Sequence, residues 1–373
     1  MPGNARLRVL SLIPHLGGGG AEHVIALLAR SLSPEKYEVH LGLITQTEIG
    51  EVGLPSWVHV HALGASRVRW GVLRLLGLVR RTKPDLILSG MFHLNFLVLL
   101  LRPFFPQGTR ILVRQNGTIS SALAFGGLPW YTRTLYRLLY RRADRVICQT
   151  NAMAGDLARE LGIQDDKLAV LPNPIEVEEI RNSIGGSATL SKGAGPHLLA
   201  VGRLSREKGF DLLLRALLLV RREFPEAELV IAGAGPEEAA LKAECHALSL
   251  DTAVSFAGYI EQPWIHLADA TLFVLPSRHE GLPNALLEAA AAGLPIVVSP
   301  ACDGIVELLR DQPGVWLASE ISAEALAASL LVAVRALRPG ERFAHAFVEA
   351  FRIDRVIQAY EALIDQTLQH QRQ

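Results

Sequence analysis

Residues 270–288 read ATLFVLPSRHEGLPNALLE, and this stretch joins an apolar run to a run of helix-forming residues. The apolar run at 270–276 has the length and character of a parallel strand that is covered on both faces. The following run at 285–292, ALLEAAAA, consists of strong helix formers. The stretch therefore predicts a buried strand, a short loop and a helix.

The predicted loop is suited to binding an anion. Gly281, Pro283 and Asn284 lie at the strand-to-helix junction, where unpaired backbone N–H groups and the helix dipole favour a phosphate. Two carboxylates flank this junction, because Glu280 lies just before it and Glu288 lies inside the helix. Seven residues separate them, so this spacing places them two turns apart on nearly the same face. A capped helix with a glutamate in its first turns is the purely structural alternative.

Apolar strands alternate with helical patterns along both halves of the chain. In the first half we expect strands at 8–13, 39–44, 58–61, 86–89, 111–113 and 146–149. In the second half we expect them at 198–201, 228–232, 254–257, 271–275 and 296–299. This alternation predicts an α/β protein with doubly wound sheets.

A linker is predicted near the middle of the chain. Residues 169–175 contain two prolines, and residues 183–195 form a polar run rich in glycine and serine. We therefore expect a first Rossmann-like domain at 1–180, a second at 181–352, and a terminal helix within 353–373. Two such domains leave a cleft between them, which is the natural place for a ligand.

The composition indicates a globular protein with an uneven charge distribution. Of the 373 residues, 50% are hydrophobic and 20% are charged, and the net charge is zero. Residues 1–185 contain 21 Lys+Arg and 14 Asp+Glu, whereas the remaining residues contain 16 and 23. A basic first half suggests an anionic acceptor or a membrane surface, although ordinary scatter of surface charges is an equal alternative.

Cys148, Cys245 and Cys302 are far apart and show neither metal-binding nor redox spacing, which fits a reducing cytoplasm. No apolar stretch is long enough to span a bilayer. We expect a cytoplasmic protein, either soluble or peripheral on the inner face of the membrane, with no nucleic-acid partner.

The segment 278–288 resembles the signature of retaining glycosyltransferases of family 4, which have the GT-B fold. The resemblance implies that Glu280 addresses the hydroxyls of the donor sugar and that Glu288 addresses the ribose. It also implies that the loop N–H groups face the diphosphate of a nucleoside diphosphate sugar; the loop residues are Gly281, Leu282, Pro283 and Asn284. A carboxylate suits a vicinal diol because it can accept two hydrogen bonds at once.

Two cations follow the first strand of the second half, in the segment 201–209, VGRLSREKG. Arg203 and Lys208 would project from the carboxyl end of a strand, where ligands bind in open α/β sheets. Alone, they could equally be solvated surface charges. The run resembles the donor-domain loop of family 4, and the resemblance implies that both cations neutralise the departing diphosphate.

Two features of the first half receive roles from the same resemblance. A glycine-rich turn at 17–20 precedes the first helix, and Gly18 and Gly19 would face the donor sugar and phosphates. The alternative is a flexible turn without a ligand. His93 follows the strand at 86–89 in an expected loop at 90–95, and we assign it to sugar positioning, although a lone histidine is more often structural.

Asn173, in the sequence LPNPI, resembles the interdomain hinge of the family and would either bind the ligand or cap a turn. Gly258, Tyr259 and Ile260 follow the strand at 254–257 and look like the segment that receives the nucleobase. Backbone groups there can hydrogen-bond to a base edge, but they do not indicate which base is bound.

Two arginine-rich stretches, at 70–81 and 130–145, could form amphipathic helices with basic and apolar faces. Such a helix can lie on an anionic membrane surface. A helix that simply covers the sheet would show much the same pattern. Both alternatives remain open from the sequence.

The resemblance implies a retaining transferase that needs neither a cofactor nor a metal ion. It would move a hexose or N-acetylhexosamine from a UDP- or GDP-sugar to a hydroxyl of a lipid-linked saccharide or an envelope polysaccharide precursor. The acceptor would attack the face from which the phosphate departs, and the departing phosphate oxygen would take the proton. The alternatives are a nucleotide-sugar epimerase of the same fold and a noncatalytic nucleotide-sugar-binding protein.

Overall fold

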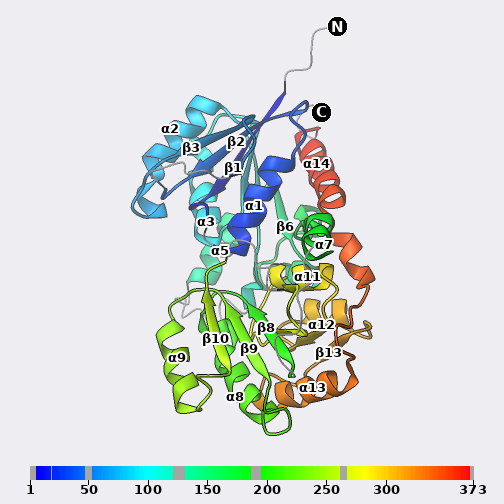
Figure 1. Cartoon of the computed structure of the whole chain (residues 1–373). Coiled ribbons are helices and arrows are strands. Elements are labelled where there is room, and N and C mark those ends of the chain that lie inside the picture. The colour runs from blue at the N-terminus through cyan, green and yellow to red at the C-terminus, as the bar shows by residue number, and fades with distance from the viewer. Residues whose placement is uncertain are drawn as a thin grey trace. The chain divides into compact units, whose positions relative to one another are not determined.

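The computed structural model describes residues 6–17, 19–46, 53–120, 131–185, 195–260 and 267–369. The chain divides into two compact units (Figure 1). Unit 1 combines residues 1–174 with residues 353–373, and unit 2 consists of residues 175–352. Each unit is built around a parallel sheet covered by helices, which confirms the predicted α/β class.

Unit 1 contains a parallel sheet of seven strands in the order β3-β2-β1-β4-β5-β6-β7. Its strands are β1 (Leu7–Ile13), β2 (Tyr37–Leu43), β3 (Val58–Ala62), β4 (Leu86–Ser89), β5 (Arg110–Arg114), β6 (Arg145–Cys148) and β7 (Leu168–Val170). Its helices are α1 (Gly20–Ser31), α2 (Val72–Thr82), α3 (Phe92–Leu101), α5 (Thr132–Tyr140), α6 (Asn151–Leu161) and α14 (Ile353–Gln369). Short 3₁₀ turns occur at η1 (Val68–Trp70), η2 (Arg102–Phe104) and η3 (Asp165–Lys167).

The two faces of the unit 1 sheet carry different helices. Successive residues of a strand point to opposite faces, so Leu10 and Leu12 of β1 pack in one core and Val9 and Ile13 in the other. The first core includes residues of α2, α3, α5 and α6, and the second includes residues of α1 and α14. Figure 1 shows α1 and α14 side by side, although they lie at opposite ends of the chain.

Unit 2 contains a parallel sheet of six strands in the order β10-β9-β8-β11-β12-β13. Its strands are β8 (His197–Val201), β9 (Glu228–Ala232), β10 (Val254–Gly258), β11 (Leu272–Leu275), β12 (Ile296–Val298) and β13 (Val315–Leu317). Its helices are α7 (Val177–Gly185), α8 (Phe210–Val220), α9 (Glu238–Ala247), α11 (Asn284–Ala291), α12 (Asp303–Leu309) and α13 (Ala323–Ala336), with 3₁₀ segments η4 (Arg206–Lys208) and η5 (Ala346–Phe351). The stretch at 270–288 forms the predicted strand, loop and helix as β11 and α11.

The boundary between the units lies at residue 174, six residues before the boundary expected from the sequence. The difference arises because α7 packs within unit 2, where Val177 and Ile180 are buried in the core that also contains α11. The first part of the expected linker, at 169–175, begins within a strand, because residues 169 and 170 belong to β7. Its polar part at 183–195 overlaps the end of α7, and residues 186–194 lie outside the described part of the chain.

A buried cation ties several parts of unit 1 together. Arg114, at the end of β5, is the largest fully buried side chain among the described residues and is 1% exposed. Its Nε donates to the Tyr360 hydroxyl of α14 at 3.2 Å. The two terminal nitrogens donate to the side-chain oxygens of Asn116 and Asn173. The guanidinium therefore connects the sheet to α14 and to the last residues of the first segment through neutral oxygen acceptors.

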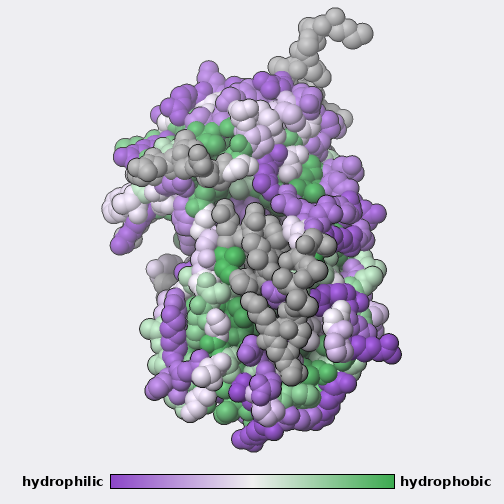
Figure 2. Space-filling model, viewed as in Figure 1, coloured by the Kyte–Doolittle hydropathy of each residue, from purple (hydrophilic) through white to green (hydrophobic). Residues whose placement is uncertain are grey.

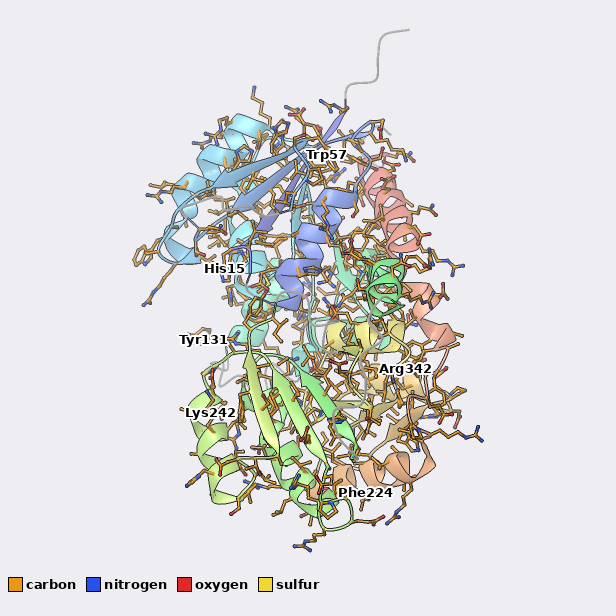
Figure 3. The ribbon with its side chains drawn as sticks, viewed as in Figure 1. His15, Trp57, Tyr131, Phe224, Lys242 and Arg342 are labelled. Carbon is orange, nitrogen blue, oxygen red and sulfur yellow. The ribbon has the colours of Figure 1, made fainter. Side chains whose placement is uncertain are left out.

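The outward sides of α9 and α14 are mainly polar in the view of Figure 2. Side chains project from the helices of both units (Figure 3), and Lys242 of α9 places its ammonium 5.7 Å from the ring centre of Phe256. Among the described residues, no helix has the length and apolar character that crossing a bilayer requires.

Candidate functional site

The predicted site residues of unit 2 follow the two strands at which the strand order reverses. In the order β10-β9-β8-β11-β12-β13, β8 and β11 are neighbours, and the chain winds away from them in opposite directions. The crevice beyond the carboxyl ends of two such strands is where ligands bind in open α/β sheets. Arg203 and Lys208 follow β8, and Glu280 follows β11. The topology therefore brings together motifs that are more than 70 residues apart in the sequence.

Glycines allow the backbones of these turns to touch. Gly233, after β9, has φ +150°, and a Cβ there would overlap the carbonyl oxygen of Gly202. Gly209, with φ +67°, lies in the same way against the carbonyl oxygen of Pro276. Both positions combine positive φ with a backbone contact, so no residue with a side chain fits. The turns after β8, β9 and β11 therefore form one rigid surface.

An ion pair forms the centre of this surface. The Lys208 ammonium lies 2.6 Å from Oε1 of Glu280, and the Ser277 hydroxyl donates to the same oxygen at 2.7 Å. The Glu280 side chain is only 7% exposed, and that of Lys208 is 24% exposed. A buried carboxylate is stable here because two donors share it. Ser277 was not predicted from the sequence, since a serine after a strand has no distinctive pattern.

A second ion pair fixes the turn after β11 against α8. The Arg278 guanidinium donates two parallel hydrogen bonds to the Asp211 carboxylate, at 2.7 and 2.6 Å. The Arg278 backbone N–H donates to the carbonyl oxygen of Glu207 at 2.8 Å. The arginine holds the pKa of Asp211 below its usual range, against the opposing effect of burial. Arg278 was not given a role from the sequence, and it holds the segment that carries Glu280 in place.

Arg203 is a cation of this site whose charge no carboxylate neutralises among the described residues. Its side chain is exposed, and within the described residues no carboxylate forms an ion pair with it, whereas the charge of Lys208 is shared with Glu280. Arg203 therefore offers an uncompensated charge to an anion that approaches the carboxyl ends of β8 and β11.

Glu288 lies in α11 and differs sharply from Glu280. Its side chain is half-buried, and burial raises its pKa to about 7. No hydrogen bond or ion pair to its carboxylate occurs among the described residues. The two glutamates are not two positions on one helix face, because α11 begins only at Asn284. Glu280 is placed by Lys208 and Ser277 instead, and Glu288 is left as an acceptor without a donor.

Glu288→Gln is expected to stabilise the protein at alkaline pH. Because the folded-state pKa is raised, the stability present below the ordinary pKa of 4.5 is lost as pH rises through about 7. After allowance for partial exposure, the gain of the variant at about pH 8 should be about 1–2 kcal/mol. Urea unfolding at about pH 5 and about pH 8 measures it.

Glu307→Gln, on the exposed surface of α12, is the matched control and should show no such pH-dependent gain. Equal stability of Glu288→Gln and the parent protein at both pH values would contradict an unpaired, half-buried carboxylate at this position.

The start of α11 has the geometry expected of an anion site. Pro283 precedes the helix with extended backbone angles and provides no side-chain cap. The Cys302 thiol donates to the carbonyl oxygen of Gly281 at 3.3 Å, which fixes the loop from the other side. Leu282 is buried, so the loop is anchored while Asn284 begins the helix. The N-terminal end of the helix dipole therefore lies beside the turn that carries Glu280.

Gly258, Tyr259 and Ile260 lie at the end of β10. Gly258 has φ +70°, and its carbonyl oxygen accepts a hydrogen bond from Gly233 at 2.7 Å. Tyr259 is exposed. The segment is therefore joined by its backbone to the same group of turns, at the side of β9 and β10.

In unit 1 the reversal of strand order falls between β1 and β4. Gly19 caps α1 directly after β1 with an extended backbone, and Gly18 lies outside the described residues. His93 follows β4 but is not in a loop, because α3 begins at Phe92 and places His93 in its first turn with an exposed side chain. Gly19 and His93 thus occupy the switch point of this sheet.

Asn173 is 4% exposed, and its amide oxygen accepts a hydrogen bond from Arg114. This contact is neither a turn cap nor a ligand contact, and the role of Asn173 at the ligand stays a prediction. The hydrogen bond between the Asn173 amide oxygen and Arg114 lies within unit 1 and anchors the end of the first chain segment.

Comparison with known proteins gives two family matches. Residues 18–179 match the glycosyltransferase family 4 model, and residues 188–337 match the model of glycosyl transferases group 1. A relative from Campylobacter jejuni, N-acetylgalactosamine-N,N'-diacetylbacillosaminyl-diphospho-undecaprenol 4-alpha-N-acetylgalactosaminyltransferase, is 29% identical over 79% of this chain and 81% of its own length. Several other relatives match over less than two thirds of their own length.

Solved structures show the same fold. Sucrose-phosphate synthase from Thermosynechococcus elongatus superposes with a TM-score of 0.78 at 17% identity, over 97% of this chain and 99% of that one. HepE of Anabaena, solved in complex with UDP and glucose, gives a TM-score of 0.74 at 17% identity, over 96% and 100%. These matches confirm the predicted GT-B class of two Rossmann-like domains. With a family match on each unit, the chain belongs to the family 4, group 1 glycosyltransferases.

Proposed function

We propose that this glycosyltransferase is a retaining enzyme that moves a hexose or N-acetylhexosamine from a nucleoside diphosphate sugar, with UDP or GDP as the nucleotide, to an acceptor hydroxyl. One observation carries the proposal: Lys208, which pairs with the buried carboxylate of Glu280, lies with the unpaired cation Arg203 in the segment after β8, at the switch point of the unit 2 sheet. That arrangement offers both a site for a diphosphate and a fixed carboxylate for sugar hydroxyls.

The diphosphate is proposed to lie on Arg203, Lys208 and the N–H groups at the start of α11. When the bond to the sugar breaks, negative charge grows on the phosphate oxygen, and cations already held in place stabilise it without reorganisation. Lys208 is held in place by Glu280 at 2.6 Å. Arg203 supplies the charge that is not compensated within the protein.

The two glutamates are proposed to bind different diols. Glu280 is buried and shares one oxygen with Lys208 and Ser277, which leaves the rest of the carboxylate to accept from sugar hydroxyls. Glu288 has no donor within the described residues and would accept from the ribose. Because the ionised carboxylate is the stronger hydrogen-bond acceptor, donor affinity should rise with pH through about 7.

The backbone at Gly258, Tyr259 and Ile260 is proposed to receive the nucleobase. On unit 1, His93 and the turn at Gly18 and Gly19 are the proposed contacts to the transferred sugar. The nucleobase assignment uses backbone groups. The His93 side chain is exposed, so a ligand can reach it.

In the proposed step, the bond between the sugar C1 and the phosphate oxygen breaks while the acceptor oxygen bonds to C1 on the same face. The acceptor proton passes to the departing phosphate oxygen. The products are the glycoside, with its anomeric configuration kept, and the nucleoside diphosphate. No side chain has to act as a base.

The acceptor is proposed to be a lipid-linked saccharide or an envelope polysaccharide precursor, met in the cytoplasm at the inner face of the membrane. Support comes from the relative in Campylobacter jejuni, whose name describes a diphospho-undecaprenol acceptor. The basic composition of residues 1–185 is consistent with an anionic acceptor.

A donor and acceptor screen tests the proposal. UDP- and GDP-sugars are incubated with polyprenyl-diphosphate saccharides, and nucleotide release, product mass and anomeric configuration are recorded. Transfer with retention supports it, and inversion would refute the retaining mechanism. Conversion of the donor sugar to an epimer without an acceptor would identify the epimerase alternative, and donor binding without turnover would identify a noncatalytic protein.

EDTA is expected to leave the transferase rate largely unchanged. Arg203, Lys208 and the start of α11 provide the positive potential that would otherwise require a divalent cation on the diphosphate. Initial rates with EDTA, and after adding back Mn²⁺ or Mg²⁺, measure it. Complete loss of activity on chelation, restored by either metal, would contradict the metal-independent assignment.

A further inference from the structure

The outward side of one helix layer in unit 1 is unusually apolar. Of the eleven large hydrophobic side chains that are exposed among the described residues, seven lie on η1, α2, the end of α3 with η2, and α5. These helices share one face of the sheet, because each contributes to the same core. We call the outward side of these segments the α2–α5 surface.

Helix α5 shows the pattern most clearly. Tyr136 and Leu139 face the core. Tyr131, which precedes the helix and is labelled in Figure 3, is exposed together with Leu135 and Leu138. Their spacing of four and three residues places them along one stripe. A helix that only covers a sheet has a polar outer side, so packing within unit 1 does not account for this stripe.

Exposed apolar side chains also occur on the segments that neighbour α5. Leu73 on α2 is 81% exposed and Trp70 on η1 is 66% exposed. Leu100, at the end of α3, and Phe104, on η2, are 54% and 60% exposed. The apolar residues therefore extend from α5 across the neighbouring helices.

The charge of this part of the chain has a single sign. Residues 52–143 contain 13 Lys+Arg and one acidic residue, Asp85. Asp85 is already paired with Arg8. Six arginines of α2 and the α5 region form no ion pair with a carboxylate of the described chain; they are Arg74, Arg80, Arg81, Arg137, Arg141 and Arg142. The dipole at the end of α5 accounts for Arg141 and Arg142, but not for the exposed leucines between the arginines.

We propose that the α2–α5 surface docks on an anionic phospholipid membrane. Arginines would contact the headgroup phosphates, while leucine and aromatic side chains enter the interface, where tryptophan and tyrosine are favoured. A nucleic acid could neutralise the arginines, but it offers no apolar phase for Leu73 or Leu138. Each basic residue near such a surface contributes about 1 kcal/mol, so six are enough for reversible docking.

The inference deepens the proposed function, on which it rests for the lipid-linked acceptor, because docking would bring the enzyme to that substrate. Docking itself requires no catalysis. Glu280→Ala should therefore bind vesicles as the parent protein does, and failure of docking can be told apart from failure of the transferase assignment.

Vesicle co-sedimentation tests the proposal. The full chain should bind vesicles of phosphatidylcholine with about one third phosphatidylglycerol at least about tenfold more tightly than pure phosphatidylcholine. Binding should weaken as salt rises from about 50 to about 500 mM. Arg137→Glu/Arg141→Glu/Arg142→Glu should lower it at least about tenfold. The matched control, Arg222→Glu/Arg310→Glu/Arg338→Glu on the exposed surface of unit 2, changes the net charge equally and should bind almost as the parent does.

The apolar contribution is tested with Leu135→Ser/Leu138→Ser, which leaves every charge in place. This variant should lose most of the binding that persists at high salt. Equal losses in the two arginine triples would show a general effect of net charge, and unchanged binding of the leucine variant would show adhesion to any polyanion. Either result, or equally weak binding to both vesicle types, would overturn the proposal. Matching thermal unfolding curves confirm that the variants are folded.

Discussion

Replacing Glu280 with alanine is expected to lower kcat for sugar transfer by about 10³-fold. Glu280 is held by Lys208 at 2.6 Å and by Ser277 at 2.7 Å, so its carboxylate has one position. Without it, the sugar loses its proposed acceptor, and Lys208 loses the partner that holds its ammonium in place. Initial rates with the best donor and acceptor measure the effect. Because the residue acts on the reacting sugar, kcat should fall more than donor affinity does.

Glu324→Ala is the matched control, since Glu324 is an exposed glutamate in the first turn of α13 in the same unit. It should keep nearly full activity. Wild-type turnover in Glu280→Ala would remove that residue from the site. A large loss of thermal stability in that variant would assign the effect to folding, and Glu280→Gln, which retains the shape of the side chain, then separates the two causes.

Arg114→Met should destabilise unit 1 by about 3–5 kcal/mol. Arg114 is 1% exposed and donates to Tyr360, Asn116 and Asn173. Methionine fills much of the same volume but removes the donor to two buried oxygens, those of Tyr360 and Asn173, and each such loss costs about 1–3 kcal/mol. The half-buried Asn116 oxygen also loses Arg114 but still accepts from Gln149 at 3.3 Å. Urea unfolding measures the change in the transition of unit 1.

Two further variants make this result specific. Arg81→Met, on the exposed surface of α2, removes a cation of the same size and should change stability by less than about 0.5 kcal/mol. Leu217→Ala, in the core of unit 2, identifies the other unfolding transition. If Arg114→Met and Arg81→Met had the same stability, the buried hydrogen bonds would contribute nothing net.

Eleven of the thirteen strands in the described part of the chain could be predicted from their apolar runs; β7 and β13, of three residues each, were missed. The positions of the site motifs could be predicted because ligands bind at the carboxyl ends of strands. The apolar run at 270–276 and the following helix formers indicated β11 and α11, and the structure has them there. Since parallel strands end at the same edge of a sheet, Arg203 and Glu280 could be expected near each other. This inference required only that the strands be parallel, and it did not require their exact order in the sheet.

The contacts within the site could not be predicted. Lys208 and Glu280 were given separate tasks from the sequence, yet they form one ion pair across 72 residues of chain. The raised pKa of Glu288 depends on what surrounds α11, and periodicity alone carries no such information. Arg114 was given no role from the sequence, because nothing local reveals that its partners include Tyr360, 246 residues away.

His93 illustrates a different limit. The sequence FHLNFLVLLL of α3 is apolar on all sides, and the residue before the helix provides no side-chain cap. Neither a capping residue nor an amphipathic pattern therefore marks where the helix starts. Because α3 begins at Phe92, at least four residues earlier than a loop at 90–95 allows, the predicted loop histidine is a residue of the first helical turn.

The two-segment construction of unit 1 also sets an order of events during synthesis. Residues 175–352 form a continuous unit that can fold as soon as it leaves the ribosome. The core that contains Val9 and Ile13 is completed only when α14 has been synthesised, because α14 contributes residues to it. The usual sequence, in which the N-terminal domain folds first, is reversed at the final step. Until Ile353 and the residues after it emerge, the nascent chain exposes this apolar face of the sheet. We expect a chaperone to contribute most to folding at this stage, because it can cover the exposed apolar surface.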